Sequence, residues 1–176
     1  MRMWLFAACC VLLFSAAPIQ AQVPSHLYDK QADFSRYKTF AWARFANATG
    51  LGELTEGQLR GTLQVALAAK GLTKTQSGTP DIFLAYEIVS TDPKDARTFE
   101  LLWPDGARQA GVLGLNGTAM PIHQGDLVLD FYDATTKQLV WRSVATNPVN
   151  LEGKPASRQK QLDRATEKLL KHYPPG

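Results

Sequence analysis

The three histidines, His26, His123 and His172, are the residues to test first for metal binding or acid–base chemistry. They lie about fifty to a hundred residues apart, and none has a second candidate ligand at a spacing such as H-x-x-x-H. His172 falls in the last turn of an expected helix, where the helix dipole already favours a partly charged imidazole. We therefore predict no metal site and no cofactor.

Paired carboxylates, which glycosidases need, are the next chemistry to consider. Asp126 and Asp130 share one face of an expected strand, where four residues separate them by about 13 Å. Glycosidases hold their two carboxyl groups roughly 5–9.5 Å apart. We interpret Asp126 and Asp130 as charges that face solvent, and Asp133 as a turn residue.

The remaining catalytic motifs are incomplete. The glycine-rich run 111–117 has no strand before it, no helix after it and no Lys-Ser/Thr pair, all of which a phosphate-binding loop requires. No serine lies in a G-x-S-x-G turn, which presents the nucleophile of many hydrolases. We therefore predict no catalytic residue.

Two residues, Trp103 and His123, stay as candidates for ligand binding. Both flank the glycine-rich segment 106–125, and functional residues concentrate in loops. An aromatic ring and an imidazole at the ends of such a segment could bound an apolar pocket for a small ligand.

The first twenty-one residues have the three parts of a secretory signal peptide. Arg2 supplies the positive charge, residues 3–14 are apolar without interruption, and Ala21 is the small residue at the expected cut. A transmembrane helix needs about 20 apolar residues, so we expect cleavage rather than a membrane span. An alternative is acylation at Cys9, as in a bacterial lipoprotein, although the apolar run before Cys9 is short.

Removal of residues 1–21 changes what the chain can do. Cys9 and Cys10 both leave with the leader, so the exported chain 22–176 has no disulfide, thiolate metal site or cysteine nucleophile. The formal net charge falls from +3 to +2 because only Arg2 is lost, and such a mild excess predicts no nucleic-acid partner. Residues 22–176 have the length of a single domain.

The elements that would position any site follow from hydrophobic periodicity. Residues 39–42 alternate as a strand. A helix is expected from Thr55, whose capping box ends at Gln58, to a left-handed Gly71, with an apolar stripe of leucines. The stripe consists of Leu59, Leu63 and Leu67. Residues 82–89 are apolar on both faces, which indicates a central strand.

The second half predicts a hairpin and a final helix. Residues 125–132 and 138–146 form the hairpin. Two alternating sets of apolar residues compete for the buried face of the return strand, so the sequence does not decide which set faces the core. Residues 99–103 form a possible short strand, and residues 104–124 are expected to be irregular. Ser157 begins the final helix, with Leu162 and Leu169 on its apolar stripe. We predict the α+β class, with a mixed four- to five-stranded sheet and two helices packed on one face.

Four stretches together resemble the DUF4136 family of bacterial envelope proteins. They are DFSRYKTFAW at 33–42, KGL at 70–72 ahead of Pro80-Asp81, GDLVLDFYDATTKQLVWR at 125–142, and the final helix running into YPP at 173–175. The resemblance implies an exported α+β domain, often a lipoprotein, over nearly all of residues 22–176. It implies no catalytic residue, because the function of the family is not established.

Three classes of function compete. A non-catalytic binding or assembly module of the envelope comes first, because no acid, base, nucleophile or metal constellation emerges from the residues. A small-ligand carrier, with a pocket under the 106–125 segment, comes second. An enzyme comes third, since catalytic groups can be assembled from residues far apart in the sequence. The expected partner is an envelope protein or a small ligand, and the oligomeric state is left open.

N-terminal sequencing of the protein purified from its native host tests the expected export. We predict a mature chain that begins at Gln22, because the small residue Ala21 ends the leader. A chain that begins at an acylated Cys9, or that retains Met1, would contradict cleavage after Ala21.

Overall fold

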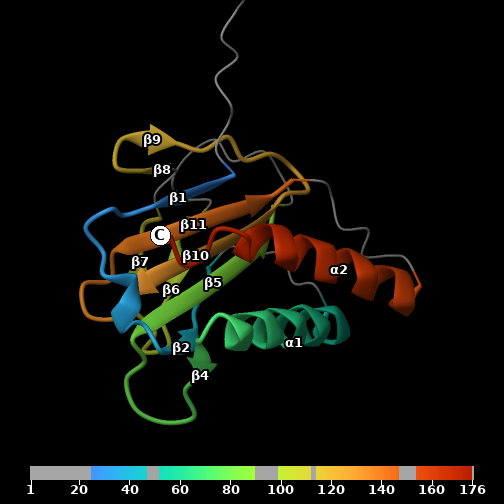
Figure 1. Ribbon diagram of the computed structural model, residues 1–176, viewed down its shortest axis with the longest axis horizontal. Helices are drawn as coiled ribbons and strands as arrows, with labels where there is room; N and C mark the ends of the chain where they lie inside the picture. The colour runs from blue at the N-terminus through green and yellow to red at the C-terminus, as the bar shows by residue number, and fades with distance from the viewer. Residues whose placement is uncertain (1–24, 47–51, 90–98, 112–113, 147–153, 176) are drawn as a thin grey trace, which may run out of the picture.

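The computed structural model describes residues 25–46, 52–89, 99–111, 114–146 and 154–175 (Figure 1). Its elements in chain order are β1 (His26–Tyr28), the 3₁₀ turn η1 (Phe34–Arg36), β2 (Thr39–Trp42), β3 (Arg44–Phe45), α1 (Glu53–Ala69), β4 (Thr73–Lys74), β5 (Ile82–Ile88), β6 (Leu101–Leu102), β7 (Arg108–Gln109), β8 (Gly114–Leu115), β9 (Thr118–Ala119), β10 (Leu127–Asp133), β11 (Leu139–Ala145) and α2 (Pro155–Leu170). In the described part of the chain, neither helix is long and apolar enough to cross a bilayer.

A mixed six-stranded sheet organises the molecule, in the order β1-β11-β10-β5-β2-β4. The antiparallel β10–β11 hairpin and the parallel β2–β5 pair confirm the predicted mixed sheet and the α+β class. The predicted count of four or five strands is too low, because short segments pair at both edges. β1 pairs antiparallel with β11, and the two-residue β4 pairs with β2. Strands so short carry no readable alternation, which is why periodicity misses them.

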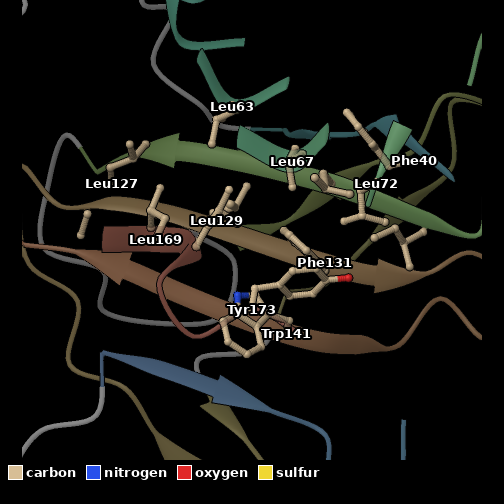
Figure 2. Close-up of a cluster of buried hydrophobic side chains, with 14 of the residues drawn as sticks. Phe40, Leu63, Leu67, Leu72, Leu127, Leu129, Phe131, Trp141, Leu169 and Tyr173 are labelled. Carbon is tan, nitrogen blue, oxygen red and sulfur yellow. The ribbon is translucent and has the colours of Figure 1, made fainter. Parts of the chain in front are cut away.

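Both helices lie on the same face of the sheet, as predicted (Figure 1). The leucine stripes predicted on the helices are fully buried against the strands: Leu59, Leu63, Leu67, Leu162 and Leu169. Figure 2 shows Leu63, Leu67 and Leu169 among buried side chains of the strands. Together they form the helix-side core, one contiguous apolar cluster.

The opposite face of the sheet is covered as well. A small sheet, β3-β6-β7, and part of the glycine-rich segment supply a second cluster, the far-side core, which includes Phe45, Phe99, Leu101, Met120 and Ile122. β5 contributes Ile82 and Leu84 to the helix-side core and Phe83 and Ala85 to the far-side core. Cover on two faces is what its doubly apolar pattern predicts.

The glycine-rich segment is more ordered than expected, since it contains β7, β8 and β9. A Cβ at Gly111 would lie 2.1 Å from the carbonyl oxygen of Phe99, so only glycine fits there. Gly111 therefore lets the backbone pack closely against the far-side core, a structural role unrelated to phosphate binding.

The helix starts differ from the predicted ones. α1 follows Gly52, whose carbonyl accepts the Glu56 amide at 3.0 Å, and the predicted cap Thr55 is buried inside the first turn. α2 begins at Pro155 rather than at Ser157, because proline fits the first helical position, where no amide donor is needed. The predicted C-terminus of α1 is confirmed. Gly71 has φ +84°, and the Leu72 amide donates to the Leu67 carbonyl at 3.0 Å.

A register shift in the hairpin explains why the face of the return strand could not be predicted. Phe131 pairs with Trp141, and the next residue, Tyr132, pairs with Leu139, so Val140 is skipped. Such a bulge puts the adjacent Val140 and Trp141 both in the helix-side core, which breaks the alternation on which the prediction relied.

Leu63→Ala tests the assigned helix faces by chemical denaturation. Because Leu63 is fully buried, we expect the substitution to lower the free energy of unfolding by about 2–5 kcal/mol. The exposed neighbour provides the control: Gln64→Ala should change it by less than about 0.5 kcal/mol. A cost below about 1 kcal/mol for Leu63→Ala would show that this side chain does not lie in the core.

Candidate functional site

Trp103, a predicted ligand-binding candidate, lies in the far-side core with 4% of its surface exposed. Its ring packs edge-on against Phe83 and Tyr132, at centroid distances of 5.3 and 5.6 Å. The Lys137 ammonium sits 4.5 Å from its centroid, within the range of a cation–π interaction. Core packing therefore accounts for most of the contacts of Trp103.

His123, the second candidate, has a side chain that is 68% exposed. Its backbone amide donates to the Asp126 carboxylate at 2.8 Å, whereas its Nδ1 lies 3.7 Å from the same carboxylate, beyond hydrogen-bond distance. Asp126 is thus held by backbone, and the imidazole is left in solvent. The arrangement lacks the oriented acid–base pair that catalysis would need.

A cavity of about 360 Å³ borders Trp103 where β2 leaves the sheet. Its lining combines aromatic and basic side chains with the β6–β7 turn: Trp42, Ala43, Arg44, Arg60, Leu102, Trp103, Pro104 and Gly106. Arg60 is already engaged, since its Nε donates to the Tyr86 hydroxyl at 2.7 Å and its guanidinium pairs with Glu56 at 2.7 Å. His123 is not among the lining residues, so the cavity does not unite the two candidates.

The prediction that Asp126 and Asp130 face solvent is wrong. Asp130 is fully buried and accepts both a hydrogen bond at 2.7 Å from Nε of Arg142 and one at 2.8 Å from the Tyr132 hydroxyl. Asp126 is 4% exposed. The far-side core covers this face of the hairpin, so a carboxylate there must be paired. Sequence contained one usable signal: Asp130 and Arg142 stand opposite each other in the hairpin register.

Glu87 lies beside the Asp130–Arg142 pair, on the neighbouring strand β5. It is 5% exposed, and its Oε2 has no hydrogen-bond partner. Burial, with the negative charge of Asp130 as a smaller contribution, raises the pKa of Glu87 to about 7. Asp130 and Arg142 are both closed to solvent, so the cluster offers a substrate no access and is a structural element of the core.

A stack of rings that sequence analysis did not find holds the edge of the sheet. The ring of His26 on β1 lies 4.6 Å from that of His172 and 5.1 Å from that of Trp141. Burial, followed by the charge of His172, lowers the pKa of His26. These contacts join residues more than a hundred positions apart, so no local spacing could indicate them.

Among the described residues, no three His, Cys, Asp or Glu side chains gather as a metal site would require.

The outer face of α1 is the feature that packing within the chain does not explain. Leu54 and Val65 are 70% and 74% exposed, the large apolar side chains left in solvent among the described residues. With Gly57 and Gly61 they recur every three or four residues, so all four lie on one side of the helix. Residues 61–69 carry no charge. In this stretch the exposed side of α1 therefore lacks the charged residues that usually cover the solvent face of an amphipathic helix.

A groove of about 910 Å³ runs between α1 and α2 beside this face. Its floor is low on the α1 side because Gly57, Gly61, Ala66 and Ala69 have small side chains or none. The complete lining is Gly57, Gln58, Gly61, Thr62, Val65, Ala66, Ala69, Lys70, Gln159, Asp163, Thr166, Glu167, Leu170 and Lys171. The groove is large enough to seat an apolar group. We call the groove and the outer face of α1 together the α1 surface.

A family model described as "Domain of unknown function (DUF4136)" matches residues 24–175. No curated protein matches the sequence. Among solved structures, a PDZ domain protein from Parabacteroides distasonis ATCC 8503 is similar, with a TM-score of 0.52 and 12% identity. The match covers 86% of this chain but only 35% of that protein, and it indicates a shared fold alone.

The PelC dodecamer from Paraburkholderia phytofirmans is similar at a lower level. Its TM-score is 0.41 at 10% identity, over 83% of this chain and 98% of that one. A TM-score of 0.41 is too low to support a shared fold.

Glu87→Gln tests the raised pKa through the pH dependence of stability. At pH 4 the carboxyl is protonated in both the folded and the unfolded chain, so the variant should match the wild type. As pH rises from about 4.5 towards 7, the unfolded chain ionises first, and the wild type loses stability. We expect Glu87→Gln to be more stable by about 1–3 kcal/mol at pH 8.

Urea denaturation at pH 4, 6 and 8 measures the effect, with Glu167→Gln as the exposed control. A stability difference that is the same at all three pH values would contradict a Glu87 pKa near 7.

Proposed function

Because the chain belongs to the DUF4136 family, whose function is unknown, we propose that it is an exported bacterial envelope protein whose domain is a non-catalytic assembly module. In this role the domain binds protein through the α1 surface. Export is supported by the three-part leader at residues 1–21, which lie outside the described residues.

One observation carries the proposal: the outer face of α1 is apolar and uncovered. Burial of an exposed leucine or valine contributes about 1.5–3 kcal/mol, so Leu54 and Val65 together would supply much of the free energy of a docking contact. The groove extends the same surface towards α2. Exposed apolar surface rimmed by polar residues is typical of a site that binds another molecule.

The remaining polar clusters support a non-catalytic role. Asp130 and Arg142 are fully buried and neutralise each other, and His123 has no oriented acid–base partner. No described candidate combines a reactive group, a partner that activates it and room for a substrate.

A small-ligand carrier is the second candidate, favoured by the cavity of about 360 Å³ at Trp42 and Trp103. Its volume falls within the range of ligand pockets, and Arg44 offers a cation at its rim without an ion-pair partner among the described residues. The cavity touches the 106–125 segment only at Gly106, while Met120 and Ile122 pack into the far-side core. A carried ligand would therefore sit at the sheet edge rather than under the glycine-rich segment.

Site-specific photocrosslinking in the native envelope tests the assembly role. With a photoreactive amino acid at Val65, we expect one or a few discrete crosslinked products that contain another protein molecule. The same probe at Gln76, an exposed position outside the α1 surface, should give none. Absence of any discrete product at Val65 would contradict the proposal. A small molecule retained in native mass spectrometry, and lost in Trp42→Ala, would favour the carrier instead.

A further inference from the structure

Two glycines inside α1 have no packing role among the described residues. Gly57 and Gly61 lie within the helix, and a Cβ at either would meet nothing among the described residues within 4 Å beyond the local backbone. Neither has a positive φ. Glycine in a helix interior costs about 1 kcal/mol relative to alanine. A destabilising glycine that no described contact within the chain requires indicates that another molecule packs closely against the helix at that position.

The same face carries a matching projection. Val65 stands one turn after Gly61 and two turns after Gly57, and it is 74% exposed. In an antiparallel pair of α1 helices, Val65 of each copy would enter the notch at Gly61 of the other. A two-fold contact requires such reciprocity, in which residue i meets j and j meets i. Because α1 carries both the projection at Val65 and the notch at Gly61, this face of the helix is complementary to the same face of a second copy.

The charges on α1 favour the antiparallel orientation. Glu53 stands at its first residue and Lys70 directly follows its last, whereas the stretch between residues 61 and 69 is uncharged. Antiparallel packing places the end of α1 that carries Glu53 at the level of the end of the second α1 that carries Lys70. It also opposes the two helix dipoles favourably, whereas parallel packing would set like charges side by side.

The α2 wall of the groove contains a buried polar atom without a hydrogen-bond partner. Thr166 is 2% exposed and borders the groove, yet its Oγ1 has no hydrogen-bond partner. This unsatisfied polar atom in the wall of the groove is an observation independent of the glycine pattern.

We propose that the occupant of the α1 surface is a second copy of this chain, bound as a two-fold dimer through antiparallel α1 helices. The inference rests on the proposed assembly role and names its partner. Each α1 lies against the groove of the other copy, so that the order across the interface is α2, α1, α1 and α2.

Sedimentation velocity on the full chain, exported with its own leader, tests the dimer. From about 1 to 300 µM we expect a monomer–dimer transition for the wild type. Val65→Arg should weaken dimerisation at least about tenfold, because it places a charge in the notch of the other copy. Gln76→Arg adds the same charge at an exposed position outside the α1 surface, and it should leave the transition unchanged.

Two further variants separate the dimer from general effects on folding. Gly61→Ala should raise the melting temperature of the monomer, because alanine favours the helix, and yet weaken dimerisation, because a methyl group fills the notch. Glu53→Lys and Lys70→Glu should each weaken dimerisation, and the double variant should restore it. All three variants should have a lower melting temperature than the wild type, because each places a charge unfavourably at an end of the α1 dipole.

A wild type that is monomeric throughout, or a dimer that Val65→Arg and Gly61→Ala leave intact, would overturn the inference. If the chain is monomeric and the Val65 photocrosslink holds only a different protein, the assembly role stands and the second copy is excluded as the partner. If the chain neither dimerises nor crosslinks at Val65, both the inference and the proposed function fail.

Discussion

Cover on both faces of the central sheet is the constraint from which most of this structure follows. β5, β10 and β11 lie between the helix-side core and the far-side core, so the side chains of β10 and β11 are buried throughout. A carboxylate on such a strand must be paired, which Arg142 does for Asp130. A second carboxylate close by, Glu87, has no such partner, and burial raises its pKa to about 7. The chemistry inside the domain is thus a consequence of two-sided burial.

Periodicity predicted the parts of the fold that repeat over many residues. The two leucine stripes and the doubly apolar β5 were readable because each spans several turns or pleats. The edge strands and the bulge at Val140 were not readable. Two or three residues are too few to show a period, and a single skipped residue exchanges the two faces of the strand beyond it. The helix starts failed for a local reason: Gly52 and Pro155 supply backbone geometry, whereas the prediction looked for capping side chains.

The candidate site was harder to predict because burial depends on contacts remote in sequence. From the sequence, Asp130 is interpreted as a surface charge and Trp103 as an aromatic residue of a loop. In the structure the far-side core covers Asp130, and Phe83 and Tyr132 pack against Trp103. The α1 surface was visible in principle, since residues 61–69 lack any charge. The leucine stripe alone indicated an ordinary amphipathic helix. Only the exposure of Leu54 and Val65 reveals that the opposite side is apolar too.

The central claim is that the outer face of α1 is an interface and not a solvent surface. Methyl NMR with a soluble paramagnetic agent measures it directly, because the agent broadens the signals of methyl groups that it can reach. We predict that the Val65 and Leu54 methyl signals are broadened in dilute protein and protected as the concentration rises. The buried Leu63 should stay protected throughout. Equal broadening of Val65 at every concentration and in the presence of native envelope extract would contradict the account.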